Sequence, residues 1–283
     1  DTDDFKNLKF IVQTDPATNH LDVTGHKNVT IVTADHTNNV VNLTGSTGND
    51  IVYAGSGDNT VYGGAGSDSI YGGSGSDSLI GGSGNGQLIV GGSDCDTLSG
   101  GSGSYDTVIG GDGVHGHDSL SSGTGSHDSL IAGNGTDTLT AGTGVYNTLQ
   151  AGGGNDSLLG GGSHDYLDGG AGNDTLNGGN GRDESIVGGT GDNTFYAGTG
   201  GGNTLVGGTG GSDTFYVPKA IGDNVTIVGG SGTETVDFAH KDNSFVHEST
   251  AGGITTIKFT DTAQTIKVSN VDPSNIHFGV TYP

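Results

Sequence analysis

One apolar residue recurs in phase every nine to twelve residues between residues 44 and 216 of this sequence. Each of the eighteen units ends in an acid or amide, then any residue, then the apolar residue, then any residue. A disordered glycine-rich linker would not keep such a phase, so the pattern predicts an ordered repeat structure. The apolar position is occupied in every unit, by Val52, Val61, Ile70, Leu79, Ile89, Leu98, Val108, Leu120, Leu130, Leu139, Leu149, Leu158, Leu167, Leu176, Ile186, Phe195, Leu205 and Phe215.

Composition limits the core that these units can build. Hydrophobic residues make up only 29% of the chain, glycine accounts for 60 of 283 residues, and Met and Trp are absent. Such a chain buries little apolar surface and loses much backbone entropy on folding. Something other than apolar burial must therefore contribute to stability, and without it the chain is expected to be disordered.

The unit itself indicates an all-β solenoid. One inward apolar residue with an outward residue on each side makes a very short strand. The glycines supply turns that need positive φ and close approach of the backbone. Two units then form one flattened coil, and successive coils stack as parallel strands about 4.8 Å apart.

The charge of the chain favours a cation as the missing stabiliser. Asp and Glu number 32 against 8 Lys and Arg, a formal net charge of −24. This balance argues against nucleic acid and anionic membranes as partners, because both need clustered basic residues. No apolar stretch approaches the roughly 20 residues of a membrane span, and the single Cys95 excludes an internal disulfide. A carboxylate in each turn beside backbone carbonyls suits Ca²⁺, which takes oxygen ligands.

The units closest to one another carry a resemblance to a known family. They read GGAGSDSIY at 63–71, GGSGSDSLI at 72–80 and GGAGNDTLN at 169–177. This pattern resembles the glycine- and aspartate-rich nonapeptide of RTX proteins, a Ca²⁺-binding β-helix repeat, and it covers about 60% of the chain. The resemblance implies a right-handed parallel β-roll with calcium between the turns. It also implies type I secretion from a Gram-negative bacterium and an extracellular location.

Alternate units should lie on the same edge of the roll, which separates the acids into two series. The first edge carries Asp77, Asp96, Asp118, Asp137, Asp156, Asp174 and Asp213, with Asn59 and Asn193 near its ends. The second edge carries Asp50, Asp68, Asp106, Asp128 and Asp165, interrupted by Gln87, Asn147, Glu184 and Asn203. These twelve aspartates are the predicted ligands of about 5–10 calcium ions.

The second edge departs from the nonapeptide in length. Most of its units have ten residues, and Tyr105, His127 and Tyr146 are among the extra ones. The first edge is therefore predicted to be a regular series of calcium sites, and the second to hold fewer or weaker ones. The alternative is that the extra residue only relaxes the turn, with Asn or Gln hydrogen-bonding where Asp would bind metal.

The flanks differ in composition from the repeats. Residues 1–43 carry strand-like runs without the glycine-rich unit and are predicted to form an N-terminal β cap. Residues 44–216 form the roll of eighteen units, and residues 217–283 are predicted to be a C-terminal β cap of short strands and hairpins, with a turn at 251–253. Caps are expected because an open solenoid end exposes backbone donors and apolar core.

The last position of the second-edge units predicts an interaction surface. It is apolar in seven units, at Tyr53, Tyr71, Val90, Ile109, Ile131, Val187 and Val206, and these side chains should point outward. Exposed apolar patches often mark interfaces. We therefore expect self-association or packing on a sister subunit through this apolar stripe.

No catalytic constellation is evident. The histidines are scattered, and the only close pair, His115 and His117, would bind a transition metal or simply lie in a solvated loop. The chain is therefore expected not to be an enzyme. Because repeats and predicted caps account for the whole sequence, we expect a structural or adhesive extracellular protein, such as a surface-layer, matrix or filament component. The alternatives are a non-catalytic C-terminal folding and secretion module of a larger hydrolase or toxin, and an enzyme built on the solenoid groove.

Overall fold

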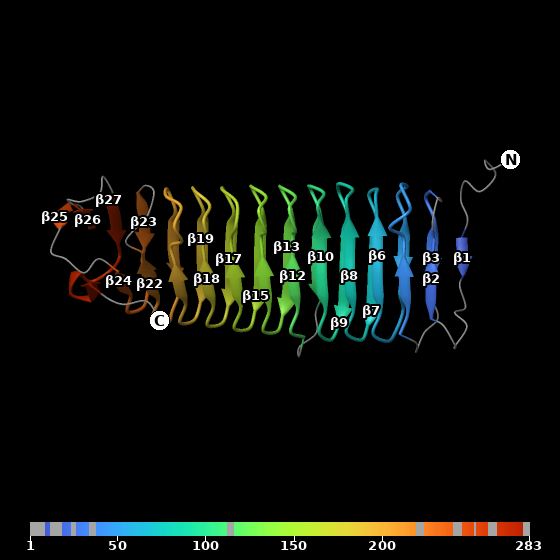
Figure 1. The fold of residues 1–283 in the computed structure, drawn as a ribbon. Helices are drawn as coiled ribbons and strands as arrows, with labels where there is room; N and C mark the ends of the chain where they lie inside the picture. Colours follow the sequence, from blue (N-terminus) through green and yellow to red (C-terminus); the bar gives the residue numbers. More distant parts are fainter. Residues whose placement is uncertain are drawn as a thin grey trace. The chain divides into compact units, whose positions relative to one another are not determined.

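The computed structural model describes residues 9–11, 19–23, 27–33, 38–111, 116–218, 224–239, 245–251, 253–259 and 265–279. It divides into two compact units, residues 1–147 and residues 148–283, and each is described by itself. In both, strands alternate along the chain between two parallel sheets, here named the odd sheet and the even sheet after their strand numbers (Figure 1).

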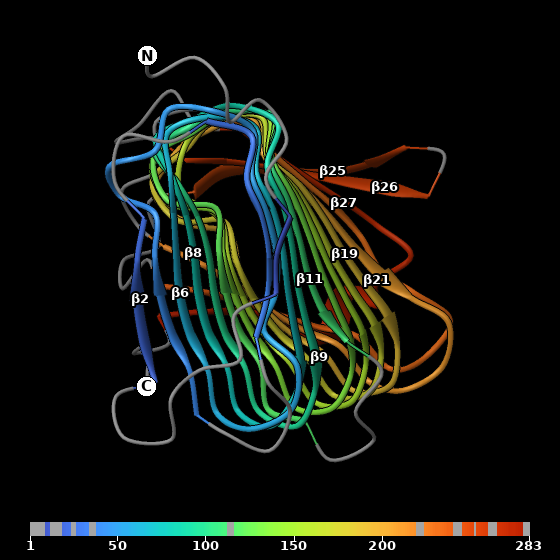
Figure 2. The ribbon, with the colours of Figure 1, turned by 90° about the vertical axis from the view of Figure 1, so that its right-hand side faces the viewer.

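In the first unit the two sheets face each other as layers, with β6 and β8 in one and β9 and β11 in the other (Figure 2). The odd sheet contains β1 (Lys9–Ile11), β3 (Thr30–Val32), β5 (Ile51–Tyr53), β7 (Ser69–Ser74), β9 (Leu88–Ser93), β11 (Thr107–Gly111) and β13 (Ser129–Asn134). The even sheet contains β2 (His20–Asp22), β4 (Val40–Asn42), β6 (Thr60–Gly64), β8 (Ser78–Gly82), β10 (Thr97–Gly101), β12 (Ser119–Ser121) and β14 (Thr138–Thr140).

The second unit repeats this arrangement and ends in a hairpin. Its odd sheet contains β15 (Thr148–Gly153), β17 (Tyr166–Ala171), β19 (Ser185–Thr190), β21 (Thr204–Gly208), β23 (Val225–Val228) and β27 (Thr265–Ser269). Its even sheet contains β16 (Ser157–Leu159), β18 (Thr175–Asn177), β20 (Thr194–Tyr196), β22 (Thr214–Val217), β24 (Thr235–Phe238) and β28 (Ile276–Phe278), the last preceded by the 3-10 helix η1 (Pro273–Asn275). β25 (Phe245–Ala251) and β26 (Ile254–Phe259) pair antiparallel around the predicted turn.

The predicted fold class is confirmed. The chain is an all-β parallel solenoid with two short strands per coil, consistent with a right-handed β-roll. Strands β3 and β4, which precede residue 44, pair in parallel with β5 and β6, and the predicted domain boundaries at 44 and 217 stay predictions. Among the described residues, no helix is long and apolar enough to cross a membrane.

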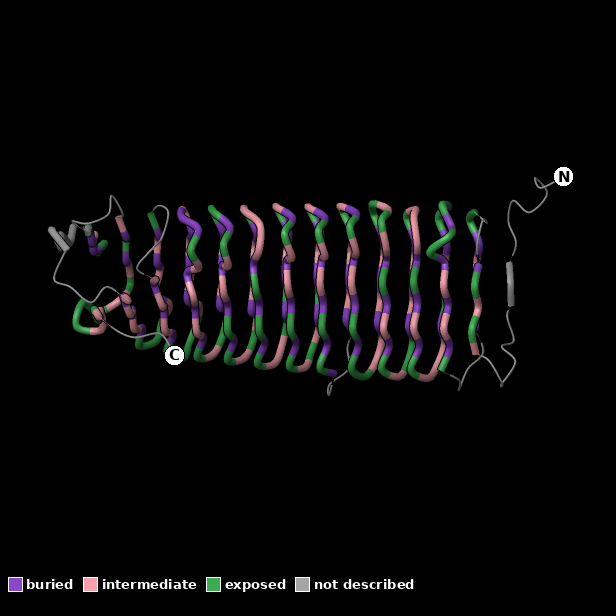
Figure 3. The backbone as a smooth tube through the Cα atoms, viewed as in Figure 1, coloured by how far each residue is buried: buried purple, intermediate pink, exposed green. Residues whose placement is uncertain are grey.

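The core consists of the apolar residue of each unit. All eighteen of these side chains are at most 1% exposed, and buried and exposed positions alternate along the strands (Figure 3). The parallel register places like on like, so that Leu98 pairs with Leu79 on one side and Leu120 on the other. In the second unit Phe195 and Phe215 stack with ring centroids 4.6 Å apart. Where the residue two positions further on is also apolar, as at Ala54, Ala132 and Val217, it is buried too. The core is therefore only one or two side chains wide in each sheet.

Close packing of coils makes some glycines obligatory. Gly92 has φ +129°, and a Cβ there would collide with the carbonyl oxygen of Gly73 in the preceding coil. Gly210 also has positive φ, +79°, but a Cβ there would meet nothing within 4 Å. We expect Gly92→Ala to destabilise the chain by at least about 3 kcal/mol, and Gly210→Ala by only about 1–2 kcal/mol from backbone strain. Urea unfolding followed by circular dichroism measures both; equal losses would show that coil spacing adapts freely.

Candidate metal centre

The residue two positions before each core residue is buried at the corner where a turn enters a strand. All twelve predicted ligand aspartates are at most 5% exposed. The amides and the glutamate that replace aspartate in other units, Asn59, Gln87, Asn147, Glu184, Asn193 and Asn203, are equally buried. A buried carboxylate is stable only with hydrogen bonds, a counter-charge or a metal ion. Each oxygen of these side chains therefore needs such a partner.

One oxygen of most of these aspartates accepts a hydrogen bond from a backbone N–H of the preceding coil. The backbone N–H of Asp77 donates to Asp96 Oδ1 at 2.7 Å, and the N–H of Asp96 donates to Asp118 Oδ1 at 2.8 Å. On the second edge, the N–H of Asp50 donates to Asp68 Oδ1 at 2.8 Å. In the second unit, the N–H of Asp156 donates to Asp174 Oδ1 in the same way. This series of bonds, here called the side-chain ladder, links successive coils at both edges.

The second oxygen of most of these aspartates is buried and accepts no hydrogen bond. A carboxylate oxygen left this way in a protein interior is strongly unfavourable unless it meets a cation or takes up a proton. The atoms in question are the Oδ2 oxygens of Asp50, Asp68, Asp77, Asp96, Asp106, Asp128, Asp174 and Asp213.

These second oxygens point at glycines and at carbonyl oxygens of the following coil. A Cβ built on Gly72 would collide with Asp77 Oδ2 and would lie 2.6 Å from the Gly91 carbonyl oxygen. A Cβ on Gly91 would likewise collide with Asp96 Oδ2 and lie 2.8 Å from the Gly110 carbonyl oxygen. At Gly72 and Gly91, an anionic oxygen and a carbonyl oxygen therefore lie beside the space that a side chain would fill. This donor set fits Ca²⁺, which is held by carboxylate and carbonyl oxygens.

Where asparagine replaces the aspartate of the unit, its Nδ2 group takes the position of the second carboxylate oxygen and donates hydrogen bonds to backbone carbonyls. Asn59 Nδ2 donates to the Gly57 carbonyl at 2.7 Å, and Asn203 Nδ2 donates to the Ala197 carbonyl at the same distance. Asn147 Nδ2 donates to the Ala141 carbonyl at 3.1 Å. Each asparagine also keeps its place in the side-chain ladder through Oδ1. The amide therefore replaces the second carboxylate oxygen and satisfies nearby carbonyls itself.

Two predicted positions differ from the common pattern. Asp165 Oδ2 accepts a hydrogen bond from the N–H of Gly161 at 3.2 Å, so this oxygen is already bound to the protein. Asp118 is the most exposed of the twelve, at 5%.

Within the described ranges, no three Asp, Glu, His or Cys side chains gather around one point. Any ion held here would therefore take most of its ligands from the backbone. His115 lies outside the described residues, so its pairing with His117 stays a prediction.

Burial changes the acidity of these carboxyls in the absence of a metal. Burial raises the pKa of Asp68 and Asp96 to about 7, and that of Asp77 and Asp106 to about 6. It raises the pKa of Glu184 to about 9, with the nearby Asp165 carboxylate adding to the effect. The side chains are therefore poised to bind either a proton or a cation.

The extra residue of the second-edge turns adopts a left-handed backbone conformation. Tyr105, His127 and Tyr146 have φ between 61° and 64°. Their rings stack along the first unit, with centroids 4.9 and 5.2 Å apart. Both tyrosines are at least half exposed. These residues precede Asp106, Asp128 and Asn147, so the longer turn leaves the side-chain ladder intact.

Two members of the side-chain ladder lie outside the predicted roll. The N–H of Asn39 donates to Asn59 Oδ1 at 3.0 Å, and the N–H of Asp213 donates to Glu234 Oε2 at 2.9 Å. Both residues are buried. The signal for them is the same acid or amide two residues before an apolar one, in NVV and ETV. Sequence reasoning missed Asn39 because the glycines of the unit are absent there. It missed Glu234, which follows the glycine-rich turn GGSG at 229–232, because the predicted roll ended at residue 216.

Comparison with known proteins agrees with this geometry. The family model described as RTX calcium-binding nonapeptide repeat (4 copies) matches residues 42–70, 53–88, 116–145, 147–176 and 178–201. No curated protein matches the sequence. The matched stretches contain members of both edges in both units, and the predicted resemblance is confirmed. Repeats of this kind bind calcium.

Proposed function

Since the chain carries RTX calcium-binding nonapeptide repeats, we propose that it is a secreted structural protein that Ca²⁺ folds outside the cell and whose copies then assemble. The observation that supports calcium-dependent folding is the row of buried aspartate oxygens without a hydrogen bond. Bound Ca²⁺ supplies positive charge and bridges oxygens of successive turns.

Oriented carboxylates and unobstructed glycines favour calcium-dependent folding of this chain. The side-chain ladder orients each carboxylate by holding Oδ1 on the preceding coil. The glycines leave the space that the second oxygen faces. Without a cation, the 32 acids repel one another, and a core of one or two side chains per strand is too thin to hold the glycine-rich backbone. Ordering of one coil places ligands for the next, so folding is cooperative along each unit.

Assembly is proposed to use the apolar stripe of the first unit. Tyr53, Tyr71, Val90, Ile109 and Ile131 follow one another in register across five strands of the odd sheet. Tyr53 is 44% exposed and Ile131 36%. Strands β3, β5, β7, β9, β11 and β13 contain no charged residue. In so acidic a chain, this is a face on which two copies meet without repulsion. In the second unit, Val187 and Val206 pair in the same way.

A calcium titration tests the proposal, followed together by far-UV circular dichroism and light scattering. We expect a coil-to-strand transition between about 10⁻⁴ and 10⁻³ M calcium, the range of extracellular modules, accompanied by growth in particle mass. Tyr53→Glu should abolish the growth and keep the transition, while Tyr62→Glu on the even sheet should change neither.

Two other outcomes of the titration would each contradict one part of the proposal. The transition without growth in mass would overturn the assembled structural role and favour a monomeric folding module of a larger secreted protein. A chain that is fully folded in chelator would contradict calcium-dependent folding itself.

A further inference from the structure

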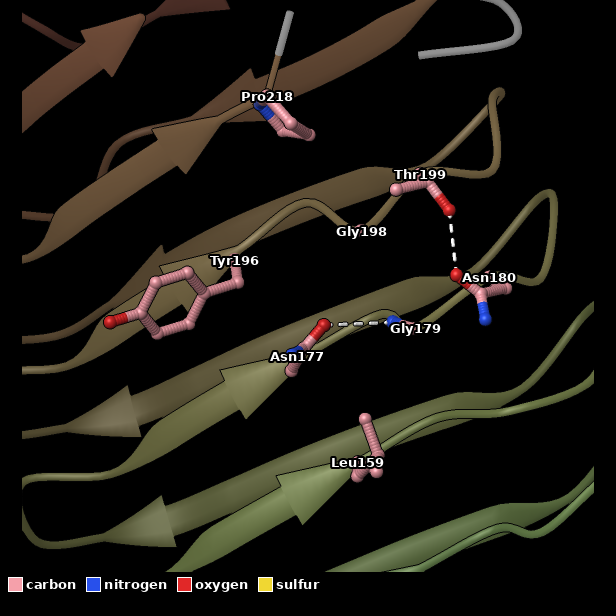
Figure 4. A pocket seen from close by; sticks show the side chains of 8 residues that line it. All are labelled: Leu159, Asn177, Gly179, Asn180, Tyr196, Gly198, Thr199 and Pro218. Carbon is pink, nitrogen blue, oxygen red and sulfur yellow. Dashed lines mark hydrogen bonds between the residues drawn. The ribbon is translucent and has the colours of Figure 1, made fainter. Parts of the chain in front are cut away.

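A groove lies on the outer face of the even sheet in the second unit, where β16, β18 and β20 end. Its volume is about 380 Å³, within the range of small-ligand sites. It is lined by Leu159, Asn177, Gly179, Asn180, Tyr196, Gly198, Thr199 and Pro218. Gly179 and Gly198 lie between Asn177 and Tyr196 on one side and Asn180 and Thr199 on the other (Figure 4). The glycines therefore form a floor between two walls of side chains.

The close stacking of coils keeps this floor free of side chains. Gly179 has φ +74°, and a Cβ there would lie 2.6 Å from the Gly160 carbonyl oxygen. Gly198 has φ +76°, and its Cβ would collide with the Gly179 carbonyl oxygen. No other residue fits these positions without strain, so the groove is a built feature of the folded unit.

The polar groups of the groove have fixed orientations. Asn177 Oδ1 accepts a hydrogen bond from the N–H of Gly179 at 2.9 Å. Asn180 Oδ1 accepts one from the Thr199 hydroxyl at 2.7 Å. Because the oxygen of each amide is held in this way, each Nδ2 is turned in the opposite direction and offers N–H donors. The groove thus presents two oriented donor groups from one coil, on either side of Gly179 (Figure 4).

The remaining wall is apolar. The ring of Tyr196 stacks on Tyr216, with centroids 5.2 Å apart and planes 16° from parallel. Leu159 is 40% exposed, and Pro218 also lines the groove. No lining residue is charged, although the chain carries a net charge of −24. A ligand of this groove must therefore combine an apolar surface with neutral hydrogen-bond acceptors.

We propose that this groove binds a neutral glycan. A sugar ring presents a face of C–H groups, which suits Tyr196 and Leu159, and an edge of hydroxyl oxygens, which accept from the amides of Asn177 and Asn180. Both amides lie on one coil, and Leu159 and Tyr196 lie on the coils on either side of it, so a ligand in this groove spans three successive coils. An anionic glycan would be repelled by the acidic protein. This inference goes beyond the calcium-dependent folding proposed above and does not depend on assembly.

The first unit contains a matched groove without the amides. It lies at the end of β6 and β8, has a volume of about 280 Å³, and is lined by Thr44, Tyr62, Gly63, Gly64, Ile80, Gly82 and Ser83. Tyr62 supplies an aromatic ring there, but no asparagine is present. If the amides are needed for recognition, this groove does not bind glycans and Tyr62 serves as a control for Tyr196.

The test is saturation-transfer NMR and affinity electrophoresis on the calcium-loaded full chain. The probes are maltohexaose and cellohexaose, with a hyaluronan oligosaccharide as the anionic comparison. We expect one of the neutral oligosaccharides to bind and the anionic one not to. Asn180→Ala and Tyr196→Leu should each weaken binding about tenfold, while Tyr62→Leu leaves it unchanged. Asn180 is exposed, so its substitution leaves the fold intact, and circular dichroism of each variant verifies this.

Three results would overturn the proposal. Neither neutral oligosaccharide binds; or binding survives both Asn180→Ala and Tyr196→Leu; or the hyaluronan oligosaccharide binds as well as the neutral ones. Each can occur in a chain that folds with calcium and self-associates, so failure here is distinguishable from failure of the proposed function.

Discussion

Asp96→Asn will stabilise the calcium-free chain and lower the number of calcium ions that the folded chain binds. The substitution keeps the oxygen that accepts from the N–H of Asp77. It removes the second oxygen, which is buried without a hydrogen bond, and introduces an amide that can donate to a carbonyl as Asn59 does. We expect a gain of about 1–3 kcal/mol in chelator, the cost of one unsatisfied buried polar group.

In saturating calcium, the same substitution will destabilise the chain. An ion bound at 100 times its dissociation constant contributes about 2.7 kcal/mol to the stability of the folded state, and Asp96→Asn forfeits a ligand of such an ion. The measurements are urea unfolding in saturating calcium, osmolyte-induced folding by TMAO in chelator, where the chain alone is unfolded, and the calcium content of the dialysed protein. The two conditions should give changes of opposite sign.

Asp96→Ala and Asn59→Asp are the matched variants. Asp96→Ala also removes the ladder bond and leaves the Asp77 N–H buried and unpaired, so it should destabilise the chain in both conditions. Asn59→Asp makes the reverse exchange on the same edge and should raise the dependence on calcium. If Asp96→Asn behaves like Asp96→Ala in chelator, the second oxygen does not face a cation site.

Acidification will stabilise the calcium-free chain and destabilise the calcium-loaded chain. Burial raises the pKa of Asp68 and Asp96 to about 7 and of Asp77 and Asp106 to about 6, against 3.8 for an unperturbed aspartate. Between pH 7 and pH 4 the folded state therefore holds more protons than the unfolded state. Stability must then rise as pH falls through this window. A carboxyl with a pKa raised by two units contributes about 3 kcal/mol over the window.

Calcium reverses the sign because protons compete with it for the same oxygens. In saturating calcium the carboxylates are ionised and bound, so protonation releases the ions and destabilises the folded state. Far-UV circular dichroism between pH 4.5 and pH 8 measures the folded fraction in metal-free buffer, and thermal unfolding over the same range measures stability in excess calcium. Parallel slopes in the two buffers would mean that the buried carboxyls are not the groups that bind the metal.

Much of the fold can be predicted from the spacing of residues along the sequence alone. The phase of the apolar residue identified all eighteen core positions, because a strand of three residues can bury only its middle side chain. The same phase placed twelve aspartates at buried corners. The predicted pattern missed Asn39, which joins the side-chain ladder without a glycine-rich turn, and Glu234, where a further glycine-rich turn carries glutamate in place of aspartate.

The roles of the two aspartate oxygens were not predictable in the same way. They depend on contacts between residues 18 to 22 positions apart, such as Asp77 with Asn59 and Asp118 with Asp96. Those separations follow from the lengths of two successive turns. The sequence alone suggested that asparagine would hydrogen-bond in place of metal, but it could not say to which carbonyl.

By itself, then, the sequence determined which residues are inside, which carboxylates are buried and which family the repeats resemble, because each of these depends on phase along one chain. Only the tertiary structure decided which oxygen bonds to the preceding coil, which aromatic rings stack at the second edge, and where glycine floors and asparagine donors form a groove. These features arise between coils, where the spacing of stacked strands brings together side chains that lie two turns apart.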